Sequence, residues 1–202
     1  MKVIGLCGGS GSGKGTVSTV FSGLGIPSID TDAVYREMTR SDSPCMQALA
    51  KAFGDDIVAD GGGLERSKLA SIVFGDHEKL SMLNSISHQY ILAETRRRLA
   101  SYKSEGYKAA IVDAPVLFES GFDSECDMVI CVISDPDLRV KRIIERDGIS
   151  QDAALKRLSN QIPNEELVSR CDYVIYNNSG IDELKAQISE IYKIIFENLN
   201  ER

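Results

Sequence analysis

Hydrophobic and polar positions follow two kinds of pattern along the chain. Short apolar runs bounded by glycine, proline or polar residues predict buried parallel strands, and segments with helical spacing of apolar residues separate them. The five predicted strands span residues 2–7, 27–30, 108–114, 128–134 and 172–177. Strands that alternate with helices in this way predict an α/β fold built on a doubly wound parallel sheet.

A long helical stretch interrupts this alternation between the second and third strands. Roughly 80 residues there show helical periodicity, as in "CMQALAKAF" and "HQYILAETRRRLASYK", broken by the turn "DGGG" at 60–63. A single crossover helix does not need that length, so the stretch is predicted to be an insertion. We therefore expect a core formed by residues 1–29 and 110–202, and a helical insertion formed by residues 30–109.

A glycine-rich loop, "GGSGSGKGT" at residues 8–16, follows the first predicted strand and precedes a helical pattern. In this context backbone N–H groups and the helix N-terminus attract phosphate, and Lys14 reaches the β and γ phosphates. A Gly/Ser turn could show such spacing by chance, but the strand, the lysine and the helix together favour a phosphate loop. The residues expected to bind nucleotide phosphates are Gly11, Ser12, Gly13, Lys14, Gly15 and Thr16.

Glycine occupies the position after the lysine, where most such loops supply a hydroxyl to Mg²⁺. We expect no direct metal ligand from Gly15, with the ion held mainly by water and by nucleotide phosphates. Thr16 stays open as a ligand and is expected to contact a phosphate oxygen. The sequence Gly-Lys-Gly-Thr is similar to that of the adenylate kinases at this position.

Two aspartates, Asp30 and Asp32, follow the second predicted strand in "IDTDAVY". The carboxyl ends of parallel strands are where α/β proteins bind ligands. A carboxylate there could orient an acceptor hydroxyl and accept its proton during phosphoryl transfer. Either aspartate could instead cap the helix that follows, and one residue in each role is also compatible with the pattern.

The third strand ends at Asp113, where an acidic residue can contact metal-bound water or an acceptor, or simply form a turn. After the fourth strand, Arg139, Arg142 and Arg146 recur at helical spacing. The default interpretation of that arrangement is a solvated basic face.

The helical patterns in residues 147–165 predict two short helices, bounded by Asp147-Gly148 and Pro163. Such a hinged segment could be a lid that excludes water and brings arginine to the phosphoryl group, and its first helix carries Arg157 and Gln161 one turn apart. The loop "YNNSG" after the last strand suits contacts with a nucleobase, but it could equally be an ordinary turn.

Together these motifs resemble the dephospho-CoA kinase family, and the resemblance extends over nearly the whole chain. The matching segments are "GGSGSGKGT", "IDTD", "GLERSKL", "DAPVLFE", "RVKRIIERD", "ALKRLSNQ" and "DYVIYNNSG". The resemblance implies phosphorylation of the ribose 3'-hydroxyl of dephospho-CoA by ATP with Mg²⁺. It also implies a P-loop kinase fold with strand order 2-3-1-4-5, a helical CoA-binding domain and a lid.

Residue roles follow from the same resemblance. It implies that Asp32 is the base or the hydroxyl-orienting group, that Arg146 and Arg157 neutralise phosphates, and that Asn177 contacts adenine. The residues implied to shape the acceptor site are Arg66, His88, Asp113, Pro115, Glu119 and Gln161. The chain departs from the family pattern at Gly15, where serine is usual, at Gln89, where proline is usual, and at Ser179, where glycine is usual.

The charge, the cysteines and the apolar runs of the chain limit the classes of partner and the location that we expect. Across 202 residues, 23 Lys and Arg against 30 Asp and Glu leave a net charge of −7, which offers no long-range attraction to nucleic acid or to an anionic membrane. The five cysteines show neither a Cys-x-x-Cys pair nor the spacing of a zinc site, so we expect reduced, mostly buried thiols. The apolar runs are too short for a signal peptide or a membrane span, so we expect a cytoplasmic protein. A monomer or small homo-oligomer is expected, without a sequence signal that separates the two.

Two other functions are compatible with a phosphate loop. A nucleoside monophosphate kinase of adenylate-kinase type is favoured by Gly-Lys-Gly-Thr and disfavoured by the long insertion after "IDTD". A nucleotide-dependent switch ATPase would need no acceptor pocket and no carboxylate at the γ phosphate, and "IDTDAVY" argues against it.

Overall fold

The computed structural model describes the backbone of residues 1–200 and the side chains of residues 1–197. The chain divides into two compact units, one formed by Met1–Ser28 with Tyr102–Arg202 and the other by Ile29–Ser101.

A five-stranded sheet of order β2-β3-β1-β4-β5 is the centre of the fold. Strand β1 pairs in parallel with β3 and with β4, and β4 pairs in parallel with β5. The strands are β1 (Lys2–Cys7), β2 (Ser28–Asp30), β3 (Ala109–Asp113), β4 (Met128–Ile133) and β5 (Tyr173–Tyr176). All five predicted strands are present, and the strand order implied by the resemblance is confirmed.

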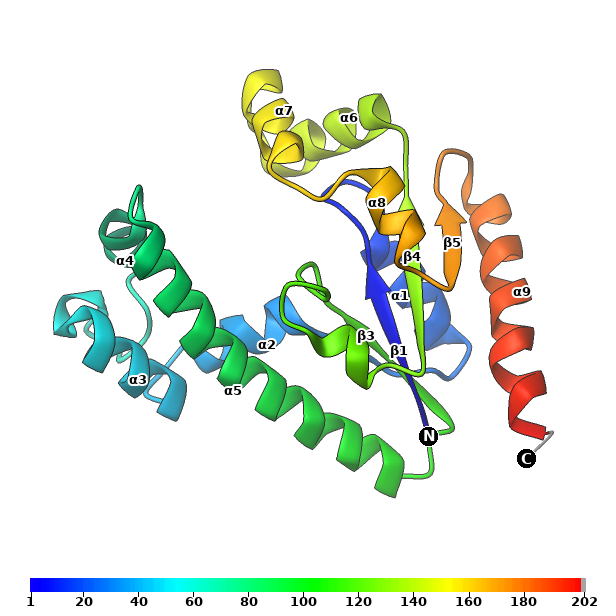
Figure 1. The fold of residues 1–202 in the computed structure, drawn as a ribbon, viewed down its shortest axis with the longest axis horizontal. Helices are drawn as coiled ribbons and strands as arrows, with labels where there is room; N and C mark the ends of the chain where they lie inside the picture. Colours follow the sequence, from blue (N-terminus) through cyan, green and yellow to red (C-terminus); the bar gives the residue numbers. More distant parts are fainter. Residues whose placement is uncertain (201–202) are drawn as a thin grey trace. The chain divides into compact units, whose positions relative to one another are not determined.

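In the first unit, helices α1 and α9 lie against one face of the sheet (Figure 1). Ile4 and Leu6 of β1 pack there with Phe21 of α1 and Ile188 of α9, all of them fully buried. Complete burial of such side chains stabilises the fold by about 1.5–3 kcal/mol each. The helices of this unit are α1 (Lys14–Gly23), α6 (Pro136–Asp147), α7 (Gln151–Ser159), α8 (Asn164–Ser169) and α9 (Ile181–Asn200), with the 3₁₀ turn η2 (Phe122–Glu125).

The second unit is helical, as the periodicity of this stretch predicts. Its elements are α2 (Thr31–Met38), α3 (Pro44–Phe53), the 3₁₀ turn η1 (Asp55–Ile57), α4 (Arg66–Val73) and most of α5 (His77–Ser104). Cys45, Leu49 and Leu69 belong to a separate apolar core in this unit. The predicted turn is formed by Gly62, at φ +78°, between Val58 and Leu64, which form an antiparallel bridge.

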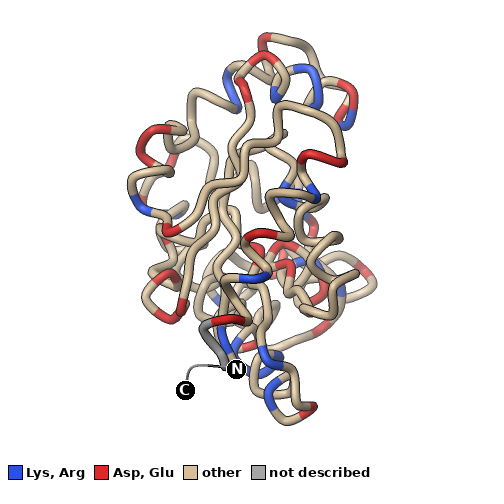
Figure 2. The backbone as a smooth tube through the Cα atoms, turned by 90° about the vertical axis from the view of Figure 1, so that its right-hand side faces the viewer, with Lys and Arg blue, Asp and Glu red and all other residues tan. Residues whose placement is uncertain are grey.

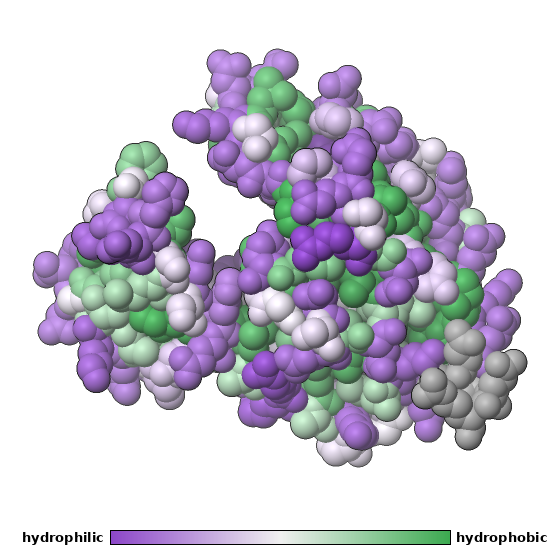
Figure 3. Space-filling model, viewed as in Figure 1, coloured by the Kyte–Doolittle hydropathy of each residue, from purple (hydrophilic) through white to green (hydrophobic). Residues whose placement is uncertain are grey.

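Charged and hydrophilic residues are spread over both units. Figure 2 shows Lys and Arg interspersed with Asp and Glu along the described backbone. The face drawn in Figure 3 is hydrophilic over much of its area, with smaller apolar areas between. Within the described residues, every helix is too short or too polar to cross a bilayer.

Candidate active site

The predicted phosphate loop connects β1 to α1, and its glycines adopt conformations that other residues rarely take. Gly8, Gly11 and Gly13 have φ values of 145°, 76° and 97°. A Cβ atom added to Gly8 would lie 2.4 Å from the Val132 carbonyl oxygen, and one added to Gly13 would lie 2.1 Å from Asn177 Nδ2. The loop therefore needs glycine for its backbone conformation and for the close approach of its neighbours.

Three side chains hold the outer side of this loop. Arg139 Nε donates to the Ser10 carbonyl oxygen at 2.9 Å, Arg142 Nη1 donates to that of Gly11 at 3.2 Å, and Asn177 Nδ2 donates to that of Ser12 at 2.8 Å. These three bonds satisfy the carbonyl groups of successive loop residues. The backbone N–H groups at the start of α1 have no partner within the helix, so they can attract an anion. The bracing pre-organises the loop for phosphate.

The prediction that Arg139, Arg142 and Arg146 form a solvated basic face is wrong for Arg139 and Arg142. Arg139 is 6% exposed, and burial lowers the pKa of its guanidinium, while Arg142 is half-buried and also donates to Ser134 Oγ at 2.9 Å. The spacing i, i+3 places both on one side of α6, and that side contacts the phosphate loop. Helical periodicity indicated a shared face but could not tell what the face would meet.

Gln161 lies beyond the end of α7 at Ser159, so its predicted place on that helix is wrong, and it also contacts the loop. Its Oε1 accepts from the Ser10 N–H at 3.0 Å and from Arg139 Nη2 at 2.7 Å, and its Nε2 donates to Ser10 Oγ at 2.9 Å. These contacts give Gln161 a structural role at the phosphate loop, which the resemblance did not imply. Its contact with the acceptor stays a prediction.

The residues at the mouth of the loop fit a phosphate chain. Lys14 Nζ donates to the Gly8 carbonyl oxygen at 2.8 Å, so its ammonium lies over the loop. Ser12 Oγ is buried and has no hydrogen-bond partner among the described residues, which leaves a donor for a phosphate oxygen. Gly15 and Thr16 are exposed in the first turn of α1.

An acidic residue that the sequence analysis did not single out joins the two predicted catalytic arginines. Asp147, the last residue of α6, accepts from Arg146 Nε at 2.7 Å and also accepts from Arg157 Nη1 of α7. The two guanidinium groups hold the pKa of Asp147 well below its usual range. One carboxylate thus fixes both arginines at the junction of the two helices.

The strand-end residues of the first unit lie near the loop. The sheet register pairs Asp113 with Leu6, one residue before the end of β1, and Asp113 is half-buried. Pro115 and Glu119 follow on an exposed segment. The structure thus places Asp113 at the same edge of the sheet as the phosphate loop.

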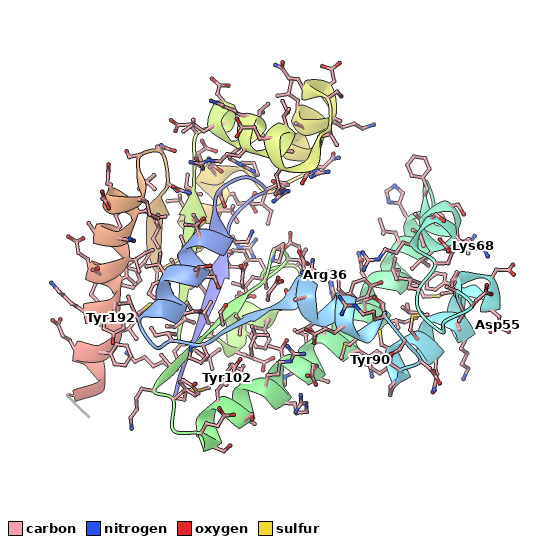
Figure 4. The ribbon with its side chains drawn as sticks, turned by 180° about the vertical axis from the view of Figure 1, so that it is seen from behind. Arg36, Asp55, Lys68, Tyr90, Tyr102 and Tyr192 are labelled. Atoms are coloured by element: carbon pink, nitrogen blue, oxygen red, sulfur yellow. The ribbon has the colours of Figure 1, made fainter. Side chains whose placement is uncertain are left out.

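In the second unit the two aspartates of "IDTD" take different positions. Asp30 caps α2, since its Oδ1 accepts from the Ala33 N–H at 3.0 Å, and its Oδ2 pairs at 3.3 Å with Arg36, which is labelled in Figure 4. Asp32 lies exposed in the first turn of the same helix. The capping alternative therefore holds for Asp30.

A hollow of about 340 Å³ in the second unit is rich in arginine. Arg66, predicted from the resemblance, lines it together with Arg36 and Arg40, which the sequence analysis did not identify. Three guanidinium groups around one hollow suit an anionic ligand such as a diphosphate. His88 lies half-buried on α5.

Comparison with known proteins decides the family. The family model for dephospho-CoA kinase matches residues 2–183. The chain belongs to the dephospho-CoA kinase family. As a member of the dephospho-CoA kinase family it is a kinase, and the adenylate-kinase and switch-ATPase alternatives are set aside.

Relatives and solved structures agree with this assignment. The dephospho-CoA kinase of Corynebacterium glutamicum is 36% identical over 98% of both chains, and that of Bacillus cereus is 40% identical over 95% of this chain and 96% of its own. The structure of dephospho-CoA kinase from Campylobacter jejuni matches with a TM-score of 0.72 and 26% identity, covering 98% of this chain and 100% of that chain. A shikimate kinase from Bacteroides thetaiotaomicron, at 14% identity and a TM-score of 0.53 over 96% of this chain and 98% of its own, shares the fold.

Proposed function

We propose that this chain transfers the γ-phosphoryl group of ATP, in the presence of Mg²⁺, to the ribose 3'-hydroxyl of dephospho-CoA. The observation that carries the proposal is a phosphate loop that needs its glycines and is braced by Arg139 and Asn177, in a chain of the dephospho-CoA kinase family. When bound, ATP supplies the transferable group and Mg²⁺ neutralises part of its charge.

The loop and α1 hold the donor in this proposal. The N–H groups of Gly13, Lys14 and Gly15 bind phosphate oxygens, and the Lys14 ammonium neutralises charge on the β and γ phosphates. Gly15 offers no side chain to a metal, so Mg²⁺ is held by water and phosphate oxygens, with Thr16 as the nearest hydroxyl in the first turn. Asn177 braces Ser12 and is proposed to contribute to the adenine site through its loop.

Arg146 and Arg157 act on the phosphoryl group in transfer. Charge spreads over the equatorial oxygens in the transition state, and positioned guanidinium groups stabilise it. Asp147 holds both arginines through its carboxylate, and it also balances their mutual repulsion. This makes Asp147 a positioning residue for the reaction.

The acceptor side of the proposal rests on arginines and one carboxylate. Dephospho-CoA carries a diphosphate, and the hollow lined by Arg36, Arg40 and Arg66 offers charges for it. Asp32 orients the 3'-hydroxyl and accepts its proton. The further residues proposed to shape the acceptor site are His88, Asp113, Pro115, Glu119 and Gln161.

The test is to incubate the purified protein with ATP and Mg²⁺ and either dephospho-CoA or AMP, then to measure the product masses. We expect dephospho-CoA to gain one phosphoryl group and AMP to react far more slowly. Efficient conversion of AMP with dephospho-CoA untouched would overturn the proposal, as would ATP hydrolysis with neither acceptor phosphorylated. Lys14→Ala is the control for contaminating kinases.

A further inference from the structure

Three cysteine sulfurs gather on one face of the sheet in the first unit. Cys7 ends β1, Cys131 is its direct partner in β4, and Cys171 lies between α8 and β5. Their Sγ atoms all lie within 4.8 Å of one another, and those of Cys7 and Cys171 are 3.5 Å apart. Neither the phosphate loop nor the acceptor site uses these thiols.

We propose that Cys7, Cys131 and Cys171 form a binding site for a thiophilic divalent cation, Zn²⁺. Zinc binds thiolate sulfur at about 2.3 Å, so two sulfurs of one tetrahedral site lie about 3.8 Å apart. The Cys7–Cys171 separation of 3.5 Å is close to that distance and no separation among the three exceeds 4.8 Å, so small side-chain adjustments suffice. Hard cations such as Mg²⁺ prefer oxygen ligands, which separates this site from the metal of phosphoryl transfer.

The fold pre-organises the three ligands. The β1–β4 register sets Cys7 beside Cys131, and the Asp172 N–H, which donates to the Val129 carbonyl oxygen at 2.9 Å, ties the next residue after Cys171 to the sheet. Cys7 and Cys131 are buried while Cys171 is half-buried. A fourth ligand, water or a small anion, can therefore reach the metal from the side of Cys171.

Nearby charges favour a metal–thiolate complex. Three thiolates and one Zn²⁺ carry a net charge of −1, and each thiol releases its proton on binding. Lys14 and Arg139 lie close enough to Cys131 to interact with its charge, and Arg170 does so with Cys171. The Asp172 carboxylate opposes them.

The site lies directly behind the phosphate loop. Cys7 precedes Gly8, and Cys131 precedes Val132, whose carbonyl oxygen underlies Gly8. A metal bonded to Cys7 and Cys131 would join the end of β1 to β4 next to the loop. Bound Zn²⁺ should therefore raise the melting temperature, because a ligand of the folded state stabilises it by mass action.

The experiment uses the full chain, reduced and freed of metal with a chelator. Co²⁺ is titrated as a spectroscopic probe, Zn²⁺ then displaces it, and bound metal per chain is measured after desalting. We expect one metal per chain, a sulfur-to-cobalt charge-transfer band, and an affinity that falls at least about 100-fold in Cys7→Ser, Cys131→Ser and Cys171→Ser. Thermal melts of the metal-free variants confirm that each is folded.

Cys45→Ser and Cys126→Ser are the matched controls, because these free thiols lie outside the cluster. Both should bind the metal as the unmodified chain does. The proposal is overturned if the reduced chain shows no charge-transfer band, or if the controls lose affinity as much as the cluster variants. It is also overturned if air oxidation joins Cys7 to Cys171 in a disulfide while the reduced chain binds no metal. None of these outcomes depends on the kinase reaction.

Discussion

Among single residues, Gly15 and Lys14 are neighbours in the phosphate loop, but the structure limits substitution at the two positions differently. Nothing lies within 4 Å of a Cβ atom built on Gly15, and its φ is not positive. Lys14 lies over the loop and carries the charge that phosphate needs. The backbone conformation of Gly15 and the space around it therefore allow a side chain at this position.

We predict that Gly15→Ser folds normally, gains roughly 0.3–0.5 kcal/mol of helix stability, and changes mainly the Mg²⁺ concentration needed for half-maximal activity. Lys14→Ala should lower kcat/KM by about 10²- to 10³-fold, because it removes charge stabilisation from the transition state. Steady-state kinetics at several Mg²⁺ concentrations measure both. Equal damage in the two variants would show that the glycine itself is required.

A pair of matched substitutions distinguishes the roles of Asp32 and Asp30. Asp32→Asn keeps the size of the side chain but cannot take a proton, so turnover should fall by roughly 10²-fold with folding and ATP binding intact. Asp30→Asn is the matched control, because asparagine still caps α2 and loses only an exposed ion pair with Arg36. The measurement is single-turnover phosphorylation of dephospho-CoA at saturating ATP. Near-normal turnover in folded Asp32→Asn would move the search to Asp113.

At the scale of elements, the junction of α6 and α7 depends on Asp147. We predict that Asp147→Asn lowers kcat by about 10-fold with little change in the KM for dephospho-CoA, because both arginines lose their common anchor. Asp147→Glu should restore part of the rate. The exposed Asp152 of α7 provides the control, and Asp152→Asn should behave as the unmodified chain. A purely structural Asp147 would lower the melting temperature and leave kcat unchanged.

Helices α2 and α5 are joined by an ion-pair network. Arg98 of α5 donates to Glu94 at 2.8 Å and pairs with Glu37 of α2, and Arg97 pairs with Glu94 at 2.7 Å. These guanidinium groups, Arg97 first, lower the pKa of Glu94 to about 2, although burial opposes them. The lowered pKa means that the ionised carboxylate favours the folded state.

The network predicts a pH dependence of stability. Because the folded pKa of Glu94 lies below its unfolded value, the stabilisation is present at neutral pH and is lost as the pH falls from about 4.5 towards 2. Glu94→Gln should lower the free energy of unfolding by about 1 kcal/mol at pH 7, and this difference should shrink below pH 4.5. Urea unfolding at pH 7, 5 and 4 measures it. A constant difference across that range would rule out the ion pairs as its cause.

For the whole chain, we expect the donor phosphates to be bound mainly through Lys14 of the first unit, and the diphosphate of the acceptor mainly through arginines of the second unit. A non-hydrolysable ATP analogue and dephospho-CoA should each raise the melting temperature by roughly 5–10 °C at 100 times their Kd. Lys14→Ala should abolish the shift with the analogue and keep that with dephospho-CoA, and Arg66→Ala should do the reverse. Loss of both shifts in both variants would contradict separate binding units.

Local sequence patterns were sufficient to predict the elements and the phosphate loop. Continuous apolar runs and period-3.6 patterns are both local, so the five strands and the helices of the 31–104 stretch could be predicted from short windows. The loop is also local, because Gly8 to Lys14 adjoin one strand and one helix. The strand order and the roles of residues such as Arg66 came from resemblance to a family, since no local pattern encodes which strands become neighbours.

Which distant side chains meet could be seen only once the fold was known. Arg139 and Ser10 are 129 positions apart, and their hydrogen bond turned a predicted solvated face into a brace for the phosphate loop. Cys7, Cys131 and Cys171 have no motif spacing, yet the sheet brings their sulfurs together. Periodicity shows which residues share a face of one element, but what that face touches depends on packing between elements far apart in the chain.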